Sequence, residues 1–297
     1  MPSSSRFRGL ILGLIAVAMF GGSLPATRAG VAHLDPWFFT FGRALIAGVI
    51  ALALVVLRRP PAPHVHIVRL GLIALCLVVG FPAALAVAAV TVPAAHGGVV
   101  LGLLPLATTV AAVVLAGERP SLFFWGLSLV GAALVVAFAL RDGSLAIATG
   151  DIFLVLAVSL TGVGYALSGI MARTMPGWLV ISWALVLSLP VTATATWVLW
   201  PADAAAVPWS SWIGLAYAGI FAQFLAYALW NAALAAGGVA RVGQLQLIQP
   251  FATIAIATFF LGESVDGETI GFAVAVVAVV ALSRRAAIGQ RPAPPGG

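Results

Sequence analysis

The sequence predicts an all-α integral membrane protein with ten transmembrane helices, arranged as two inverted five-helix repeats around a central cavity, both termini being cytoplasmic. Composition is the first observation: 63% of the 297 residues are hydrophobic and only 7% are charged, against roughly 25% charged residues in a soluble domain. Second, long apolar runs recur along the whole chain. Third, a residue pattern from the first half returns 145 positions later, which indicates a duplicated unit.

The expected spans are apolar runs separated by short breaks of charged residues, proline and glycine. Each run is close to the ~20 residues that a helix needs to cross a bilayer. The runs fall at 8–27, 37–57, 67–90, 94–116, 121–140, 151–172, 178–200, 211–235, 239–261 and 267–283. They divide into an N-terminal repeat, 1–148, and a C-terminal repeat, 149–297, within one membrane domain. The Pro- and Gly-rich tail, at about 286–297, is predicted to be disordered.

Arginine placement predicts how the chain is oriented. All fourteen basic residues are arginines. With a cytoplasmic N-terminus, eleven of them fall in inside segments and only Arg28 and Arg141 outside, while Arg43 lies within the second span. Cytoplasmic segments carry an excess of Lys and Arg. Both termini are therefore expected in the cytoplasm, and the number of spans is even.

The repeated pattern is Pro-x-Ala-Thr followed by Gly-Glu, and it closes the fourth and ninth predicted spans. Matched pairs at the offset of 145 include Pro105 with Pro250, Thr108 with Thr253, Glu118 with Glu263, Ser23 with Ser168, and Arg28 with Arg173. Five spans per half is an odd number, so the second half must insert upside down relative to the first. Inverted repeats of this kind surround a site near the membrane midplane, where one half can rock against the other.

Two kinds of residue in the repeated pattern, the prolines and the glutamates, are candidates for bending helices or for holding their ends. Pro105 and Pro250 fall within predicted spans, where a proline removes a backbone donor and kinks the helix. The kink could line a pathway or serve packing alone, and both interpretations stay open. Glu118 and Glu263 close the same helices at the water boundary. We expect them to hold neighbouring helix ends or a nearby arginine, and gating is the alternative.

Polar and aromatic side chains inside three spans are the candidate substrate contacts. Such residues are costly in a membrane and usually face the interior of the bundle. At helical spacing they form one stripe in each of spans six, eight and nine. The stripes contain Tyr165 and Ser168; Gln223, Tyr227, Trp230 and Asn231; and Gln246 and Gln249. Hydrogen bonding between helices is the alternative role.

Charged residues within the spans are rare. Arg43 lies six residues after Trp37 in the second span, and it is expected to snorkel toward the outer surface; binding an anionic group is the other interpretation. No Asp or Glu falls in the middle of a predicted span. The carboxylate relay of strongly proton-coupled carriers is therefore missing, which favours facilitated or exchange transport.

Several functional classes are excluded by the sequence. The basic residues sit singly or in pairs between apolar runs, which argues against nucleic-acid binding despite a formal charge of +6. The single cysteine, Cys76, allows no disulfide framework and no thiolate metal site. Neither the serine motif of an intramembrane protease nor the Asp-rich pairs of a prenyl-transfer enzyme occurs. No enzymatic activity, metal or cofactor is expected.

Ten spans in two five-helix repeats, each closing with Pro-x-Ala-Thr and Gly-Glu before a Gly-containing last helix, resemble the EamA-type branch of the drug/metabolite transporter superfamily. The likeness covers nearly the whole chain. The opening of the first repeat, Met19 to Ser23, is similar to the Trp-Gly-Ser opening of that family, with Phe20 in place of tryptophan. Within the family, the chain looks most similar to YddG-type amino-acid exporters.

The resemblance implies a multi-pass carrier in the cell inner membrane that exports amino acids, aromatic or neutral ones among them, or related metabolites by alternating access. A small-molecule substrate and the lipid bilayer are the expected partners, nucleic acid is not, and a monomer is favoured. Export of drugs or of another metabolite class through the same fold is one alternative. A membrane scaffold without transport activity is the other.

Overall fold

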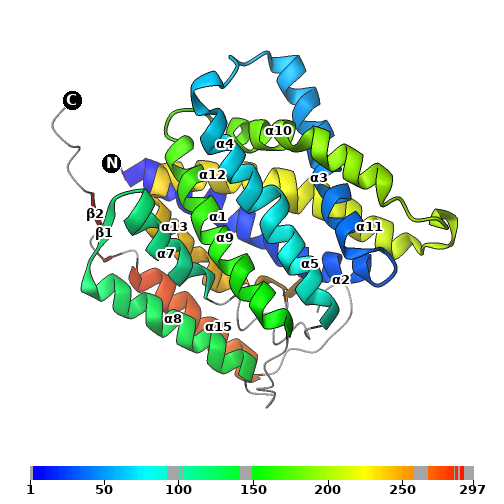
Figure 1. The fold of residues 1–297 in the computed structure, drawn as a ribbon. Coiled ribbons are helices and arrows are strands. Elements are labelled where there is room, and N and C mark those ends of the chain that lie inside the picture. The colour runs from blue at the N-terminus through cyan, green and yellow to red at the C-terminus, as the bar shows by residue number, and fades with distance from the viewer. Residues whose placement is uncertain are drawn as a thin grey trace.

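The computed structural model of the protein describes residues 3–91, 101, 103–140, 149–249, 251–253, 255–256, 267–283, 285–286 and 288–290. This part of the chain is almost entirely helical (Figure 1). Its one small sheet pairs β1 (Glu118–Pro120) with β2 (Ile288–Gln290) in antiparallel register. The predicted all-α fold is therefore confirmed for the described residues.

The helices of the first half follow the predicted spans closely. α1 and α2 together occupy the first span, and α4, η2 and α5 form the third as one segment that changes helix type. The elements are α1 (Ser3–Gly21), α2 (Ser23–Val31), α3 (Pro36–Arg58), the 3-10 helix η1 (His64–His66), α4 (Ile67–Ile73), the π-helix η2 (Ala74–Gly80), α5 (Phe81–Thr91), α7 (Leu104–Leu115) and α8 (Leu122–Leu140).

The second half repeats this arrangement. Its eighth span is again one segment of three parts, α11, η4 and α12. The elements are α9 (Thr149–Met171), α10 (Gly177–Val198), the 3-10 helix η3 (Ala204–Ala206), α11 (Trp209–Tyr217), the π-helix η4 (Ala218–Leu225), α12 (Ala226–Gly237), α13 (Val239–Gly243), the 3-10 helix η5 (Gln244–Ile248) and α15 (Gly267–Ser283).

Most of the predicted spans correspond to apolar helices. The six that are long enough to cross a membrane are Phe7–Val31, Pro36–Arg58, Ile67–Ala88, Ile152–Met171, Gly177–Val198 and Trp209–Gly237. Shorter apolar helices occur where spans four, five and ten are predicted: Leu104–Ala116, Leu122–Leu134 and Ile270–Ser283. The predicted ninth span, 239–261, begins as α13 and η5 and then enters residues outside the described part. The count of ten therefore stays a prediction.

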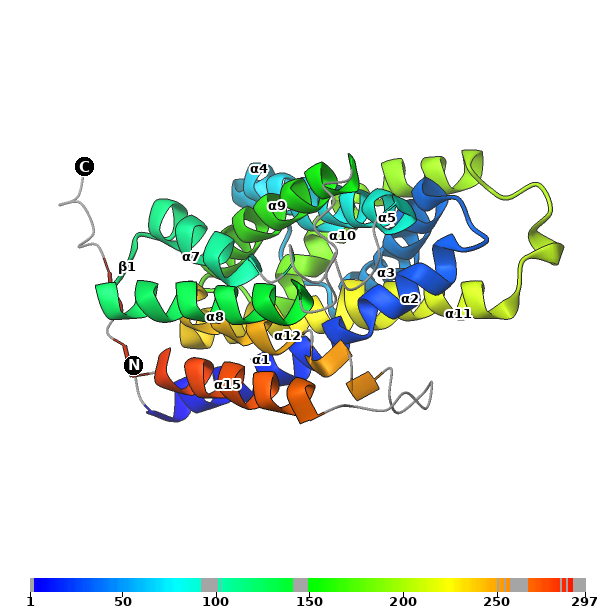
Figure 2. The ribbon, with the colours of Figure 1, turned by 90° about the horizontal axis from the view of Figure 1, so that it is seen from below.

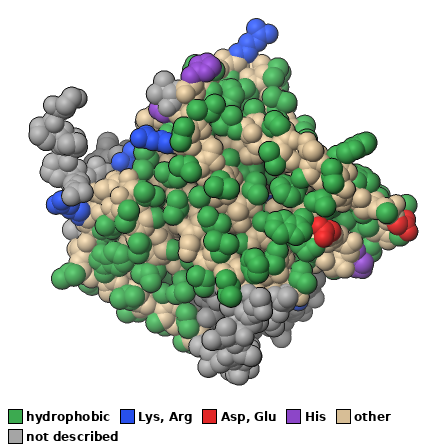
Figure 3. Space-filling model, in the orientation of Figure 1, with side chains coloured by type: hydrophobic (Ala, Val, Ile, Leu, Met, Phe, Trp, Pro, Cys, Tyr) green, Lys and Arg blue, Asp and Glu red, His purple; other side chains and the backbone are tan. Residues whose placement is uncertain are grey.

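The surface of the helical bundle is suited to lipid. Hydrophobic side chains cover most of the described surface in Figure 3, and charged side chains lie toward its edges. Leu122 and Trp197 are 90% and 83% exposed. Monomeric soluble proteins rarely expose contiguous apolar surface on this scale. Contact with the hydrocarbon core of a bilayer explains it.

α3 illustrates how the sequence starts and stops a span. The Asp35 carboxylate accepts hydrogen bonds from the amides of Trp37 and Phe38 at 2.9 and 3.0 Å, which satisfies donors that the first helical turn leaves free. Pro36 occupies the start of the helix, where its missing N–H costs no hydrogen bond. At the other end Arg59 adopts the left-handed conformation, with φ of 45°, and the chain leaves the helix.

Contacts between helices repeat at the offset of 145 residues. α3 packs against α10 and α8 packs against α15, and each of these pairs consists of two equivalent helices. α1 packs against α12, and their equivalents, α9 and α5, also pack together. Equivalent helices run antiparallel. The colours of α8 and α15 run in opposite directions in Figure 2, and Phe38, near the start of α3, meets Trp200, just beyond the end of α10, with ring centroids 5.6 Å apart.

The repeat extends to an unusual local feature. η2 at 74–80 and η4 at 218–225 are both π-helices, and the offset of 145 maps 74–80 onto 219–225. π-helices are rare and occur mostly as local distortions at functional sites. Two of them at equivalent positions therefore support duplication of one ancestral unit.

Segments predicted on the cytoplasmic side lie together at one end of the molecule. The start of α1 and the strands β1 and β2 share that end in Figures 1 and 2. There Arg241 donates through Nη2 to the carbonyl of Ala286 at 3.1 Å, and β2 pairs with β1. The prediction of a disordered tail from about 286 is therefore wrong for 288–290, because main-chain pairing with β1 orders that stretch.

Candidate functional site

Four buried aromatic rings, the aromatic cluster, lie where the two halves meet. Phe20 of α1 approaches Tyr227 and Trp230 of α12 edge-on, with ring centroids 5.1 and 6.1 Å apart. Tyr165 of α9 lies 6.2 Å from Tyr227 and 5.2 Å from Trp230. None of the four residues is more than 6% exposed. Edge-to-face contacts of this kind favour the arrangement by about 0.5–1.5 kcal/mol per pair.

Gln246 of η5 adds an amide to the aromatic cluster. Its Nε2 donates to the Tyr165 hydroxyl at 3.2 Å, which leaves its Oε1 buried without a donor among the described residues. The Trp230 Nε1 is likewise buried and without a partner there. The Tyr227 hydroxyl is buried close to the Tyr165 hydroxyl and makes no closer hydrogen bond among the described residues. Buried polar atoms in proteins are nearly always hydrogen-bonded. The cluster therefore presents donors and an acceptor that a ligand could satisfy.

Gln223 connects the two π-helices. It lies in η4, and its Nε2 donates to the carbonyl of Leu77 in η2 at 3.0 Å. A π-turn disturbs the regular ladder of backbone hydrogen bonds, and a carbonyl at membrane depth needs another donor. Gln223 supplies that donor from the other half of the molecule.

Replacing Gln223 by leucine is expected to lower the free energy of unfolding by about 1–2 kcal/mol, because the Leu77 carbonyl loses its donor. The melting temperature of the purified protein in detergent would fall. Phe221→Leu is the comparison variant, since Phe221 lies on the same π-helix but is 40% exposed and contacts only the ring of Tyr217 among the described aromatic rings; this variant should melt closer to the unaltered protein than Gln223→Leu does. Equal melting temperatures for all three proteins would contradict the role given to Gln223.

Some predicted stripe residues do not join the aromatic cluster. Asn231 donates through Nδ2 to the carbonyl of Gly177 at 3.3 Å, so it binds α10. Gln249 is half-buried and its carbonyl accepts from the Thr253 hydroxyl at 3.1 Å; its side chain makes no hydrogen bond to the cluster within the described residues. Ser168 is buried, and its hydroxyl has no partner in the described part of the chain.

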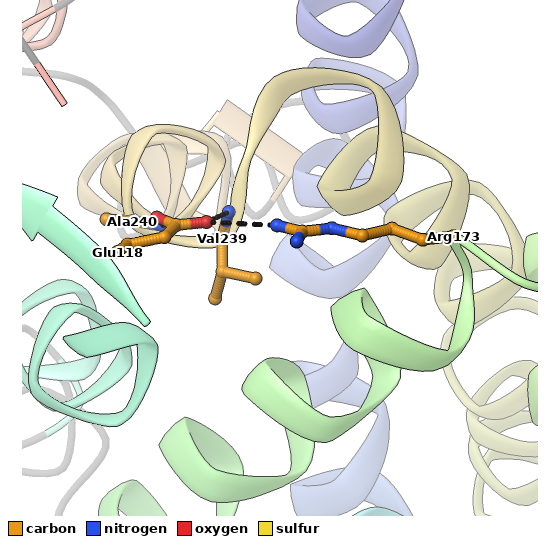
Figure 4. Close-up of polar contacts among 4 residues, drawn as sticks. All are labelled: Glu118, Arg173, Val239 and Ala240. Atoms are coloured by element: carbon orange, nitrogen blue, oxygen red, sulfur yellow. Dashed lines mark hydrogen bonds and ion pairs between the residues drawn. The ribbon is translucent and has the colours of Figure 1, made fainter. Parts of the chain in front are cut away.

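Glu118 forms hydrogen bonds and an ion pair between the two halves, at the end that carries β1 and β2. Its Oε1 and Oε2 accept from the amides of Val239 and Ala240 at 2.7 and 2.8 Å. Arg173 approaches Oε1 to 3.5 Å from the end of α9 (Figure 4). Gly238, with φ of 87°, takes a left-handed conformation that favours glycine and turns these amides toward the carboxylate. We call this set of contacts the Glu118 clamp.

The proline in α7 lies near the start of the helix. Pro105 occupies the first turn of α7, which begins at Leu104, and Leu101 just before it is also helical. Because 92–100 and 102 lie outside the described residues, the predicted kink within span four stays a prediction. Amides of the first turn have no partner within the helix, and proline is therefore tolerated there. Pro250 and Glu263, the equivalents of Pro105 and Glu118, lie outside the described residues.

The chemistry available in the aromatic cluster is that of binding. Its polar groups are an amide, two phenols and an indole N–H. Across the described residues, no group of three or more His, Cys, Asp or Glu side chains could hold a metal ion. These groups can orient a small molecule through hydrogen bonds and ring contacts.

Comparison with known proteins decides the family. A family model described as the EamA-like transporter family matches the chain twice, at residues 7–140 and at 148–285. The chain belongs to the EamA-like transporter family. It is therefore a multi-pass membrane transporter and not an enzyme. The two matches correspond to the two halves between which the helix contacts repeat.

Relatives of this EamA-family transporter agree in length and fold. The chain is 41% identical to the "Uncharacterized transporter YdeK" of Bacillus subtilis (strain 168) over 278 residues, which cover 93% of this chain and 97% of the relative. A solved crystal structure superposes with a TM-score of 0.71 at 20% identity, covering 93% of this chain and 98% of the other. That likeness shows the fold alone.

Arg43 of this EamA-family transporter corrects one expectation. The side chain is only 2% exposed, so it does not snorkel to the outer surface. It lies within electrostatic reach of Tyr227, beside the aromatic cluster. Its position within an apolar run was the available signal, but hydropathy does not tell which face of a helix a residue occupies. Phe20 was similarly known only as a departure from a family motif, and its ring contacts identify it as part of the cluster.

Proposed function

We propose that this transporter exports amino acids or closely related small metabolites from the cytoplasm by alternating access of a site between its two halves. The unpaired polar atoms of the aromatic cluster carry the proposal. The Trp230 N–H and the Tyr227 O–H suit a carboxylate, while the Gln246 Oε1 suits an ammonium group. The surrounding rings suit an apolar or aromatic side chain.

The direction of transport and the substrate class also draw on the likeness to YddG-type exporters. An alternative cargo, a drug or a different metabolite, would use the same fold. The scarcity of buried carboxylates argues against a cation-specific pump. Among the acidic side chains whose burial the structure describes, Glu118 is the one that is buried, and the clamp already engages it.

The packing symmetry supports alternating access. Two pairs of equivalent helices, α3 with α10 and α8 with α15, contact one another and run antiparallel, as expected for halves inserted in opposite directions. The Glu118 clamp closes one end of the contact between them. Opening that end would require the carboxylate to release the amides of Val239 and Ala240, and the aromatic cluster would then become accessible from the cytoplasmic side.

Transport is tested with proteoliposomes loaded with single labelled amino acids. The expected result is efflux above that of empty liposomes for at least one neutral or aromatic amino acid. A growth screen under toxic levels of single amino acids, with and without expression, reports substrate class and direction together. No flux for any amino acid above empty liposomes would overturn the proposed substrate.

A pair of glutamine variants tests the position of the site. Gln246→Leu removes an amide bonded within the aromatic cluster and is expected to lower efflux about 10-fold or more. Gln249→Leu makes the same change less than one helical turn away, at a side chain without a bond to the cluster, and should lower efflux less. Full efflux by the Gln246→Leu protein, combined with a raised melting temperature, would favour a packing role for the cluster.

A further inference from the structure

Arg43 is a buried charge in a membrane-spanning helix. It lies on α3 seven residues after Pro36, which places it about 10 Å along the helix from its outer end, and the side chain is 2% exposed. α3 passes very close to η4 at this level: a Cβ added to Gly219 would lie 3.0 Å from the Arg43 carbonyl oxygen. The backbones of span two and of the π-helix of span eight therefore approach closely at the level of Arg43.

The Arg43 guanidinium has no acceptor among the side chains that the structure describes. Its Nε is buried without a hydrogen-bond partner there, and none of the described carboxylates pairs with it. Asp35 caps α3, Glu118 belongs to the clamp, and Asp203 and Glu268 are exposed. Burying an unpaired charge is strongly unfavourable, so the anionic group of a ligand would stabilise a side chain that has no partner among the described residues.

The aromatic cluster offers both hydrogen-bond donors and an acceptor in addition to Arg43. Arg43 lies within electrostatic reach of the Tyr227 hydroxyl. Trp230, one helical turn further along α12, adds an indole N–H that has no partner among the described residues. The free Oε1 of Gln246 supplies an acceptor on the Tyr165 side of the cluster. Donors for an anion thus come from α3 and α12, and an acceptor for a cation comes from η5.

We propose that Arg43 binds the carboxylate of the transported substrate, with Tyr227 and Trp230 as further donors. The inference rests on the proposed function and narrows it to substrates that carry a carboxylate. The five N–H donors of a guanidinium can hold both oxygens of a carboxylate at once, which a lysine ammonium does not do. Substrate binding would also neutralise the buried charge, so the loaded site is more favourable to close than the empty one.

Ligand-induced thermal stabilisation of the purified transporter tests the inference independently of flux. The probes are L-leucine and L-phenylalanine, their C-terminal amides, and a panel of simple mono- and dicarboxylates, all in chloride-free buffer. The unaltered protein should respond to carboxylates and not to the amides. Arg43→Gln should weaken carboxylate binding on the order of 10- to 100-fold, and Arg43→Lys should fall between, because it keeps the charge and loses the paired geometry.

Arg58→Gln is the matched control, since Arg58 lies at the exposed end of the same helix; its binding should equal that of the unaltered protein. The inference would be overturned if carboxylates and amides bound alike, or if no carboxylate stabilised the protein. Undiminished carboxylate binding by the Arg43→Gln protein would also overturn it. If Arg43→Gln fails to fold, the Arg43→Lys comparison decides. If no amino acid is transported but another carboxylate binds in a way that depends on Arg43, the proposed substrate is wrong and the inference about Arg43 stands.

Discussion

Replacing Glu118 by alanine is expected to lower the free energy of unfolding by about 2 to 6 kcal/mol and to let water-soluble thiol reagents reach Cys76. The Glu118 side chain is 2% exposed, and it accepts from the amides of Val239 and Ala240. Alanine would leave both donors buried without an acceptor, at a cost of about 1–3 kcal/mol each. The loss falls on a contact between the halves, so they should separate more readily at that end.

Cys76 makes the second part of this prediction measurable without an engineered cysteine. It is the single cysteine of the chain, is 5% exposed, and lies on η2 next to Leu77. If the loss of the clamp favours opening by 1.4 kcal/mol or more, maleimide labelling in membranes should be roughly 10-fold faster or more. Melting temperature in detergent reports the effect on stability separately.

Two further variants separate the contacts within the clamp. Arg173 is about a third exposed, and its ion pair with Glu118 spans 3.5 Å; Arg173→Gln should therefore cost only about 0–1 kcal/mol. Glu118→Gln keeps one acceptor oxygen and should fall between alanine and the unaltered protein. Unchanged melting and unchanged Cys76 labelling in Glu118→Ala would show that the clamp does not hold the halves together.

Hydropathy and the repeat predicted most of the architecture, but they left the interiors of the spans undetermined. The predicted span 37–57 is α3, and the offset of 145 relates helices that pack as pairs, such as α3 with α10. Hydropathy did not reveal that α7 begins at Leu104, because the residues on both sides of Pro105 are equally apolar. The π-helices left no trace in it either, since one extra residue in a turn changes hydrogen bonding and not composition.

The candidate site was also predicted only in part from the sequence. Residues of span eight at i, i+4 and i+8 were predicted to share one face, but each residue turns a helix by about 100°, so a stripe drifts by about 80° over eight residues. Gln223 accordingly reaches Leu77 in span three, while Asn231 reaches Gly177 in span seven. The burial of Arg43 depends on the helices that pack against α3, among them α10 and η4, which no property of the second span alone could predict.

Trp230 is the residue whose loss should disturb the site most. It is fully buried and contacts the rings of Phe20 and Tyr165. Trp230→Ala would open a large cavity at the junction of the halves and is expected to cost about 3–5 kcal/mol of stability. Transport should be lost with it, so this variant alone does not separate folding from substrate binding.

Trp230→Phe makes that separation, because phenylalanine keeps an aromatic ring in the cluster and removes only the unpaired Nε1–H and part of the ring volume. Its stability should fall by about 1–2 kcal/mol, while the apparent substrate affinity, measured from the concentration dependence of efflux, should weaken roughly 10-fold if the indole N–H binds the carboxylate. The control is Trp197→Phe, at an 83% exposed position, which should leave affinity unchanged. An unchanged affinity in Trp230→Phe would assign Trp230 to packing and leave Arg43 and Tyr227 as the anion donors.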